Sequence, residues 1–222
     1  MSEHVVKILD AEFINHNVKR FIVEKPTGYT FVPGQGTDVS INLPEWKDQR
    51  RPFTFTGLPK WEHLEFIIKI YPEHNGVTNM LTRINEGDEL IINEPFGAIA
   101  YKGPGVFIAG GTGITPFISI FRDLYKQKKL ADNQLIFSNR TSADIILGAE
   151  LEQMLGSNYI NVYTRENVIG YLDRHIDRDY LIKTVKDFGR EFYVCGPDSF
   201  VKRVCAILVE LGADSEALVI EK

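Results

Sequence analysis

The chain has 222 residues, of which 44% are hydrophobic and 25% are charged. These values are typical of soluble globular proteins and exclude fibrous and disordered classes. The formal net charge is −5, and the composition indicates no basic face, which argues against a nucleic-acid partner. The length allows one large domain or two of about 100 residues each.

The chain begins with Met1–His4, which lacks the basic and apolar regions of a secretory signal. The longest apolar runs, such as Val106–Ala109, are far shorter than the roughly 20 residues that cross a bilayer. We therefore expect a cytoplasmic protein with no membrane partner.

Two cysteines are present, Cys195 and Cys205. If residues 198–211 form a helix, Cys205 lies about 10 Å beyond the helix start, at ~1.5 Å per residue. A disulfide needs Cα atoms within roughly 7 Å, so no disulfide is expected. Because an iron–sulfur cluster generally takes four cysteines, we expect neither a cluster nor another metal site.

Residues 1–100 contain short runs rich in Val, Ile, Phe and Thr, separated by Pro and Gly turns. Six such strands predict an antiparallel Greek-key β-barrel. Apolar residues at 77, 80, 81 and 84 predict one helix over Val77–Ile84. The expected strands are Val5–Phe13, Lys19–Glu24, Asp38–Leu43, Phe53–Gly57, Leu64–Tyr71 and Glu89–Asn93.

Residues 101–222 alternate buried-looking strands with helical patterns, which predicts an α/β doubly wound parallel sheet. The clearest helix runs from Pro116 to about Lys129. We expect a domain boundary between residues 100 and 101. The predicted strands are Val106–Ala109, Gln134–Ser138, Asn161–Tyr163, Phe192–Cys195 and Leu218–Ile220.

The glycine-rich segment Gly110–Pro116 follows the first of these strands and precedes the clearest helix. Glycines allow close approach to a pyrophosphate, and a helix start offers free N–H groups. The pattern Gly111-x-Gly113-x-x-Pro116 lacks the third glycine of the usual dinucleotide fingerprint. A plain strand-to-helix turn is therefore the alternative interpretation.

The segment Cys195-Gly196-Pro197 ends another predicted strand just before a helix. It predicts either a buried structural cysteine or a small side chain beneath a nicotinamide ring. In the first domain, Arg51-Pro52-Phe53-Thr54 combines a phosphate-binding side chain with an aromatic ring and a hydroxyl. A cationic strand end with a core Phe is the alternative there.

Taken in order, these three segments resemble the ferredoxin–NADP⁺ reductase superfamily over essentially the whole chain. The resemblance implies a flavin-binding barrel followed by a nicotinamide-nucleotide domain. It implies that Arg51 binds a flavin phosphate, Phe53 lies against the isoalloxazine and Thr54 bonds to flavin N5. Gly76-Val77-Thr78 resembles the family's pyrophosphate-binding segment. FAD is the expected flavin, with FMN as the alternative.

In the second domain the resemblance implies that Gly111, Thr112 and Gly113 contact the nicotinamide nucleotide. It places Cys195, followed by Gly196 and Pro197, beside the nicotinamide C4, and it matches Glu221 to a carboxylate that orders the active site. Thr54, Cys195 and Glu221 are thus the expected catalytic residues. Because the chain ends at Lys222, we expect no aromatic lid over the flavin and weak discrimination against NADH.

Two arginines follow successive predicted strands in the second domain. Arg140 follows Gln134–Ser138, and Arg165 follows Asn161–Tyr163. A nearby arginine accommodates the 2′-phosphate of NADP in dinucleotide-binding folds. This pattern favours NADPH over NADH as hydride donor, and solvated loop arginines are the alternative.

The resemblance implies an oxidoreductase that passes hydride from NADPH to bound FAD and single electrons to a flavodoxin or ferredoxin. A free-flavin reductase, the reductase component of an oxygenase and a non-catalytic electron-relay subunit are the alternatives. Lys47, Arg50, Arg51 and Lys60 are the only basic cluster that suggests a docking surface for an acidic carrier.

Overall fold

The structure is a computed structural model that describes residues 3–73, 75–97, 99–166 and 175–220. It divides into two compact units. The first contains residues 1–97 together with 115–123, and the second contains residues 98–114 and 124–222.

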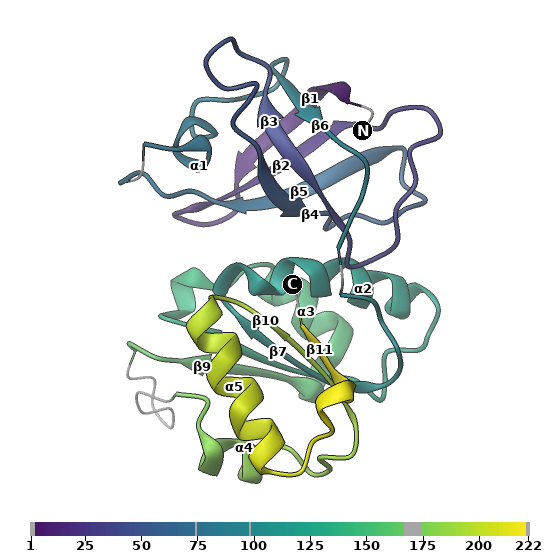
Figure 1. The fold of residues 1–222 in the computed structure, drawn as a ribbon, viewed down its shortest axis with the longest axis vertical. Coiled ribbons are helices and arrows are strands. Elements are labelled where there is room, and N and C mark those ends of the chain that lie inside the picture. Colours follow the sequence, from purple (N-terminus) through teal and green to yellow (C-terminus); the bar gives the residue numbers. More distant parts are fainter. Residues whose placement is uncertain (1–2, 74, 98, 167–174, 221–222) are drawn as a thin grey trace. The chain divides into compact units, whose positions relative to one another are not determined.

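Six antiparallel strands form the first unit (Figure 1), in the order β4-β3-β6-β1-β2-β5. An isolated bridge between Phe55 and Phe66 joins the chain just after β4 to β5, so the sheet is nearly closed. The predicted antiparallel barrel is confirmed. The strands are β1 (His4–Phe13), β2 (Val18–Glu24), β3 (Gly36–Ile41), β4 (Arg51–Thr54), β5 (His63–Lys69) and β6 (Glu89–Ile92).

The barrel interior is filled by alternate side chains of its strands, as expected when one face of a sheet is buried. In β1, for example, Val6 and Ile8 are buried while their neighbours are more exposed. Phe31 and Phe55 stack with ring centroids 4.3 Å apart at the centre of this core. The aliphatic and aromatic runs of the sequence therefore form one continuous core.

Lys19, on β2, is a fully buried lysine at the edge of this core. Its Nζ donates hydrogen bonds to the carbonyl oxygens of Leu81, Thr82 and Ile84, at 3.4, 3.3 and 2.6 Å. Desolvation by burial lowers the pKa of Lys19, and the charge of Asp88 opposes that shift. The ammonium thus replaces water for a segment that has left regular helical structure.

Replacing Lys19 with Met should lower the free energy of unfolding by about 3 kcal/mol. The reason is that buried carbonyl acceptors left without a donor cost roughly 1–3 kcal/mol each. Urea unfolding of the variant measures this loss. The exposed Lys7→Met on β1 is the matched control and should change stability by less than about 0.5 kcal/mol. Equal losses in the two variants would contradict this role.

The helix predicted over Val77–Ile84 is shorter in the structure, where α1 is Val77–Met80. Val77, Leu81 and Ile84 are buried, as the spacing predicted. The later carbonyls bind Lys19 instead of continuing the helix. The long-range ammonium therefore replaced the local helical hydrogen bonds.

Strand β4 also differs from the prediction, since Phe53–Gly57 was expected and Arg51–Thr54 is observed. The register pairs Thr54 with Gly36 and Arg51 with Val39. After Thr54 the chain leaves β3, and Phe55 pairs with β5. The whole Arg51–Thr54 segment therefore lies within the strand.

The second unit is built on a five-stranded parallel sheet in the order β11-β10-β7-β8-β9. The predicted parallel sheet is confirmed. Its strands are β7 (Gly105–Gly110), β8 (Gln134–Asn139), β9 (Tyr159–Tyr163), β10 (Glu191–Cys195) and β11 (Leu218–Ile220).

Helices α4 (Arg178–Thr184) and α5 (Asp198–Glu210) pack on one face of this sheet. Figure 1 shows α5, in yellow, lying along the strands. Leu181 of α4 and Leu208 of α5 are fully buried against alternate strand residues such as Ile108 and Val194. On the opposite face, the rings of Phe107 and Tyr193 stack at 4.2 Å.

Helix α2 (Thr115–Lys126) begins one residue before the predicted start and ends three residues before the predicted end. Lys128 has a positive φ of 58°, which an α-helix cannot contain, so the helix must end before it. Helices α3 (Gly148–Leu155) and α4 were not predicted from the sequence.

Both cysteines are free, as expected from their spacing. Burial raises the pKa of the Cys205 thiol, which disfavours its reactive thiolate.

Among the described residues, no helix is long and apolar enough to cross a membrane. The described residues also contain no group of three His, Cys, Asp or Glu side chains arranged to hold a metal ion.

Candidate functional site

The segment Arg51–Thr54 lies on β4, at one end of the strand order of the barrel sheet. Arg51 and Pro52 are exposed, and Phe53 and Thr54 are half-buried. Arg51 donates one guanidinium hydrogen bond, of 2.7 Å, to the carbonyl oxygen of Arg50. Because a guanidinium carries five N–H donors, four remain for a ligand.

Gly36 on β3 allows the backbone of β4 to approach closely at Phe53. A Cβ atom at position 36 would lie 2.5 Å from the carbonyl oxygen of Phe53, which real contacts essentially never reach. Only glycine permits this pairing, which sets the position of Phe53 and Thr54. Gly36, the first residue of β3, therefore sets how closely the Phe53–Thr54 part of β4 approaches β3.

Thr54 makes a side-chain contact that sequence reasoning missed. Its Oγ1 lies 2.7 Å from the Oγ1 of Thr115, the first residue of α2, and either hydroxyl can donate. Thr115 belongs with the barrel in the first compact unit. The sequence does show Thr115 directly before Pro116, after the glycine loop. Spacing alone, however, could not predict a contact between residues 61 positions apart.

Gly76, Val77 and Thr78 form the start of α1. A Cβ atom at Gly76 would meet nothing within 4 Å, so the space beside this backbone is open. Its φ of −134° is available to any residue, so the backbone conformation does not require glycine. Close approach of a ligand is a physical reason for a glycine at such a place.

The described residues fit a flavin nucleotide on three observations. Arg51 has unused donors for a phosphate, Thr54 provides a hydroxyl beside the half-buried ring of Phe53, and Gly76 leaves backbone uncovered. Phe53 and Val77 both pack on the barrel core, which holds the two segments on one rigid element.

In the second unit the glycine-rich segment follows the carboxyl end of β7. Gly111–Ile114 form a 3₁₀ turn, and α2 begins directly at Thr115. Gly111 has a positive φ of 55°, which favours glycine, and a Cβ there would meet nothing within 4 Å. Gly111 therefore leaves open space beside the backbone at the edge of the sheet where open α/β folds bind ligands.

Gly113 and Cys195-Gly196-Pro197, predicted separately, are brought together. Cys195 of β10 pairs with Ala109 of β7, so the two following loops are neighbours. A Cβ atom at Gly113 would lie 2.5 Å from the nitrogen of Gly196. Gly196 has a φ of 156° and also packs on Gly110. Cys195 is 4% exposed beneath this contact.

Replacing Gly113 with Ala should destabilise the protein by about 1–3 kcal/mol, because the added methyl group overlaps backbone that cannot rotate away. It should also weaken binding of NADP⁺, since the loop must shift. Thermal unfolding and titration with NADP⁺ measure the two effects. Gly103→Ala is the control, because a Cβ there would meet nothing within 4 Å. An unchanged melting temperature in Gly113→Ala would refute the close packing.

The start of α2 is suited to an anion. The first turn of this 12-residue helix contains no acidic residue, so no carboxylate of that turn neutralises the positive end of the helix dipole. By contrast, α5 carries Asp198 in its first turn. Of the two helices that follow β7 and β10, α2 is thus the better one for a pyrophosphate.

Arg140 and Arg165 lie side by side at the ends of β8 and β9. The backbone N–H of Arg165 donates to the carbonyl oxygen of Arg140 at 2.9 Å, and Thr164 makes the same contact with Asn139. Both guanidinium groups are exposed, and neither forms an ion pair within the described part of the chain. The two arginines therefore occupy neighbouring positions at the carboxyl edge of the sheet.

Two carboxylates that follow these strands accept hydrogen bonds from the Thr141–Ser142 segment. Asp144 accepts hydrogen bonds from the backbone nitrogen and Oγ1 of Thr141, at 2.9 and 2.7 Å. Glu166 accepts from the backbone nitrogen and the hydroxyl of Ser142. These contacts reduce the capacity of both carboxylates to bind a ribose diol.

Sequence reasoning also missed Asn139, the last residue of β8. It is 5% exposed, and neither its side-chain oxygen nor its nitrogen has a hydrogen-bond partner. It adjoins Arg140 at the carboxyl edge of the sheet. The predicted catalytic residue Glu221 lies outside the described residues.

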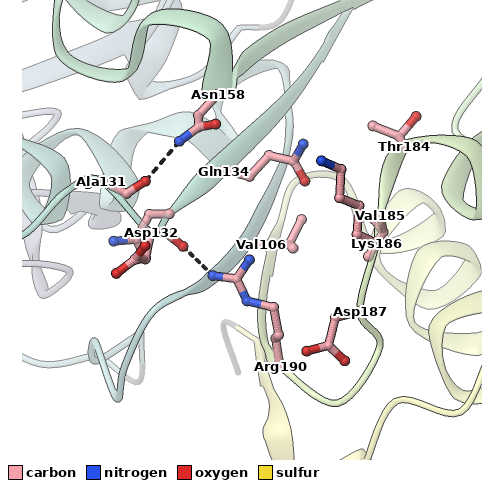
Figure 2. A pocket seen from close by; sticks show the side chains of 11 residues that line it. Val106, Ala131, Asp132, Gln134, Asn158, Thr184, Val185, Lys186, Asp187 and Arg190 are labelled. Atoms are coloured by element: carbon pink, nitrogen blue, oxygen red, sulfur yellow. Dashed lines mark hydrogen bonds between the residues drawn. The ribbon is translucent and has the colours of Figure 1, made fainter.

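A pocket of about 230 Å³ lies in the second unit, lined partly by Lys186 and Arg190 (Figure 2). Among the lining residues, the Arg190 guanidinium donates a hydrogen bond to the carbonyl oxygen of Asp132. The Asn158 side-chain amide donates one to the carbonyl oxygen of Ala131. Because Val106 and Gln134 are early residues of β7 and β8, this pocket is at the amino edge of the sheet. It is separate from the glycine loop.

Two family models match the chain. Residues 5–101 match the oxidoreductase FAD-binding domain, and residues 107–206 match the oxidoreductase NAD-binding domain. The expected cofactors, FAD and a nicotinamide nucleotide, are confirmed by these matches.

Among curated proteins, the chain is 24% identical to the naphthalene 1,2-dioxygenase system ferredoxin–NAD(P)⁺ reductase component of Pseudomonas putida, over 94% of the chain and 65% of that protein. It is 26% identical to the propane 2-monooxygenase reductase component of Rhodococcus jostii, over 89% of the chain and 57% of that protein. It is 29% identical to NADH-cytochrome b5 reductase 1 of Bos taurus, over 68% of the chain and 60% of that protein. The chain thus spans less than two thirds of these relatives' lengths.

Solved structures share the fold. A ferredoxin NADP⁺ reductase from Neisseria gonorrhoeae with bound FAD and NADP superimposes with a TM-score of 0.83 at 18% identity, covering 99% of this chain and 98% of that one. The cytochrome b5 reductase domain of Ulva prolifera nitrate reductase gives 0.82 at 22% identity, covering 99% and 97%.

Together, the barrel, the parallel sheet and the two domain matches define an oxidoreductase that binds FAD and a nicotinamide nucleotide. The chain belongs to the ferredoxin–NADP⁺ reductase superfamily.

Proposed function

We propose that this chain catalyses hydride transfer from NADPH to FAD bound on its barrel and delivers the electrons to a separate protein carrier. Bound FAD supplies the conversion of a two-electron donor into single electrons, and the protein supplies binding and orientation. The observation that carries the proposal is the shared edge of β7 and β10, where the glycine loop packs directly on Cys195 and Gly196.

The barrel residues have the following proposed roles toward FAD. Arg51, next to Pro52, binds a phosphate through its unused donors. Phe53 lies against the ring system, and Thr54 directs its hydroxyl to flavin N5. Gly76, Val77 and Thr78 contact the pyrophosphate through the backbone that the missing side chain of Gly76 leaves open.

The sheet residues have the corresponding roles toward the coenzyme. Gly111, Thr112 and Gly113 contact the nicotinamide nucleotide, and Cys195, with Gly196 and Pro197 after it, supports the ring at C4. Glu221 is proposed as the carboxylate that orders this region. These assignments rest on the resemblance, and the contact between Gly113 and Gly196 supports them.

NADPH is the proposed hydride donor, in preference to NADH. Arg140 and Arg165 stand together at the sheet edge, and the nearby Asp144 and Glu166 are held by Thr141 and Ser142. A pair of guanidinium groups suits a 2′-phosphate, whereas a 2′-hydroxyl is bound by a carboxylate that does not already accept hydrogen bonds from the protein.

A ferredoxin is the proposed acceptor, with flavodoxin as the alternative. The Pseudomonas putida relative is by name a ferredoxin–NAD(P)⁺ reductase component, and the Rhodococcus relative is the reductase component of a monooxygenase. Of the basic cluster, Lys47, Arg51 and Lys60 are exposed, while Arg50 is paired with Glu3. Because both of these relatives are by name reductase components, the reductase component of an oxygenase is the second candidate function.

The test is the visible spectrum of the purified protein before and after anaerobic addition of NADPH. Yellow protein that bleaches would support bound flavin and hydride transfer together. Colourless protein that reduces added flavin would favour a free-flavin reductase. Protein that does neither would contradict an enzymatic function. Reduction of a ferredoxin, a flavodoxin and cytochrome b5, compared under the same conditions, then identifies the class of acceptor.

A further inference from the structure

The hydroxyl groups of Thr54 and Thr115 form a pair inside the first compact unit. Their oxygen atoms are 2.7 Å apart, which is a normal length for an O–H···O hydrogen bond. Thr115 is 8% exposed and Thr54 is half-buried. The Thr115 end of the pair is therefore buried, while the Thr54 end remains partly accessible.

A second hydroxyl contact holds α2 against the barrel one turn later. Ser119 is fully buried and lies four residues after Thr115, so the two side chains share one helix face. The backbone N–H of Gly34 donates to Ser119 Oγ at 3.0 Å. The position of Thr54, the other member of the pair, is fixed by the pairing of β4 with Gly36 of β3. Backbone on both sides thus fixes the separation of the two hydroxyls.

A threonine hydroxyl has one proton to donate and can accept from another group at the same time. If Thr54 donates to a ligand, it can accept from Thr115. If Thr54 accepts from a ligand, its own proton can turn to Thr115. The pair can therefore serve a ligand atom that is an acceptor in one state and a donor in the other.

We propose that Thr115 is a positioning residue that acts through Thr54. It allows the hydrogen bond between the two hydroxyls to reverse its direction when bound FAD is reduced. The inference rests on the proposed function, in which Thr54 faces flavin N5. N5 accepts a hydrogen bond in oxidised flavin. The hydride from the nicotinamide gives N5 a hydrogen, which makes it a donor, while the coenzyme loses two electrons and is oxidised. No proton leaves the chain, because the two hydroxyls only rotate.

Removing the Thr115 hydroxyl should weaken reduced FAD more than oxidised FAD. In Thr115→Val, Thr54 can still donate to oxidised N5. With reduced flavin its proton would have no acceptor, and a buried unsatisfied donor is costly. We expect the affinity for reduced FAD to fall about tenfold more than that for oxidised FAD. This corresponds to a two-electron potential about 30 mV more negative. Thr115→Ser retains the hydroxyl and should restore the wild-type value.

The experiment measures the reduction potential of bound FAD against a reference dye, and the affinity of apoprotein for oxidised FAD, in the full chain. The variants are Thr115→Val, Thr115→Ser, Thr54→Val and the double variant Thr54→Val/Thr115→Val. If Thr115 acts through Thr54, adding Thr115→Val to Thr54→Val should change the potential no further. Additive shifts would overturn the proposal.

The two levels of failure give different results. Wild-type protein that binds no FAD would overturn the proposed function and this inference with it. Wild-type protein that binds FAD and is bleached by NADPH, with Thr115→Val at the wild-type potential, would overturn the inference alone. Thermal unfolding checks each variant, and Thr115→Ala compared with Thr115→Ser replaces the valine variant if that one does not fold.

Discussion

Replacing Arg140 and Arg165 together with Ala should lower kcat/KM for NADPH by about 10²- to 10³-fold while changing kcat/KM for NADH by less than about threefold. Charge-assisted hydrogen bonds contribute roughly 1.5–3 kcal/mol each, and every 1.4 kcal/mol is tenfold. One backbone hydrogen bond of 2.9 Å joins Arg165 to Arg140, so the two side chains start from neighbouring backbone positions. Steady-state rates with a one-electron dye as acceptor measure the effect.

The matched control for the arginine pair is Arg178→Ala. Arg178 is exposed on α4 and has no proposed role. Its replacement should leave both coenzymes unaffected. The single variants Arg140→Ala and Arg165→Ala should each give part of the loss. A double variant that loses NADPH and NADH activity equally would refute the 2′-phosphate site.

Replacing Thr54 with Val should slow reduction of bound FAD by NADPH about 10²-fold. Loss of one preorganised hydrogen-bond donor at a reacting centre typically costs 10²–10³ in rate. The barrel should fold normally, because valine has nearly the same shape and β4 keeps its pairing with β3. Anaerobic stopped-flow measurement of flavin bleaching gives the rate directly.

Thr54→Ser is the conservative variant and should retain most of the rate, because it keeps the hydroxyl that lies 2.7 Å from Thr115. The Kd for oxidised FAD separates binding from chemistry in both variants. A valine variant that is reduced at the wild-type rate would show that the Thr54 hydroxyl does not face N5.

Much of the fold was predictable because local patterns and core packing agree. The alternation of β1 and the apolar runs of β7, β8 and β10 gave the right element types. Disagreement arose where a distant residue intervened. Helix α1 ends early because Lys19, more than 60 positions away, binds the following carbonyls. Helix α2 ends at Lys126, before the left-handed Lys128, and the sequence gives no indication of that conformation.

The candidate site divides in the same way. Arg51–Thr54, the glycine loop and Cys195–Pro197 could be recognised as segments, because their residue types carry the chemistry. Asn139 could not, since an asparagine at a strand end is ordinary until its burial without a partner is seen. Helices α3 and α4 could not be predicted either, because their eight and seven residues contain too few periodic apolar positions to distinguish them from loops.

The order and chemistry of its motifs, together with strand periodicity, were enough to define a flavin-binding barrel followed by a nucleotide-binding sheet. Which groups touch was decided only in three dimensions. Gly113 meets Gly196, Arg165 meets Arg140, and Thr54 meets Thr115 through strand register and helix placement. Such contacts join residues 25 or more positions apart, and side-chain spacing along a chain specifies neighbours only within one helix or strand. Burial of the whole core selects the register, and the register brings the site together.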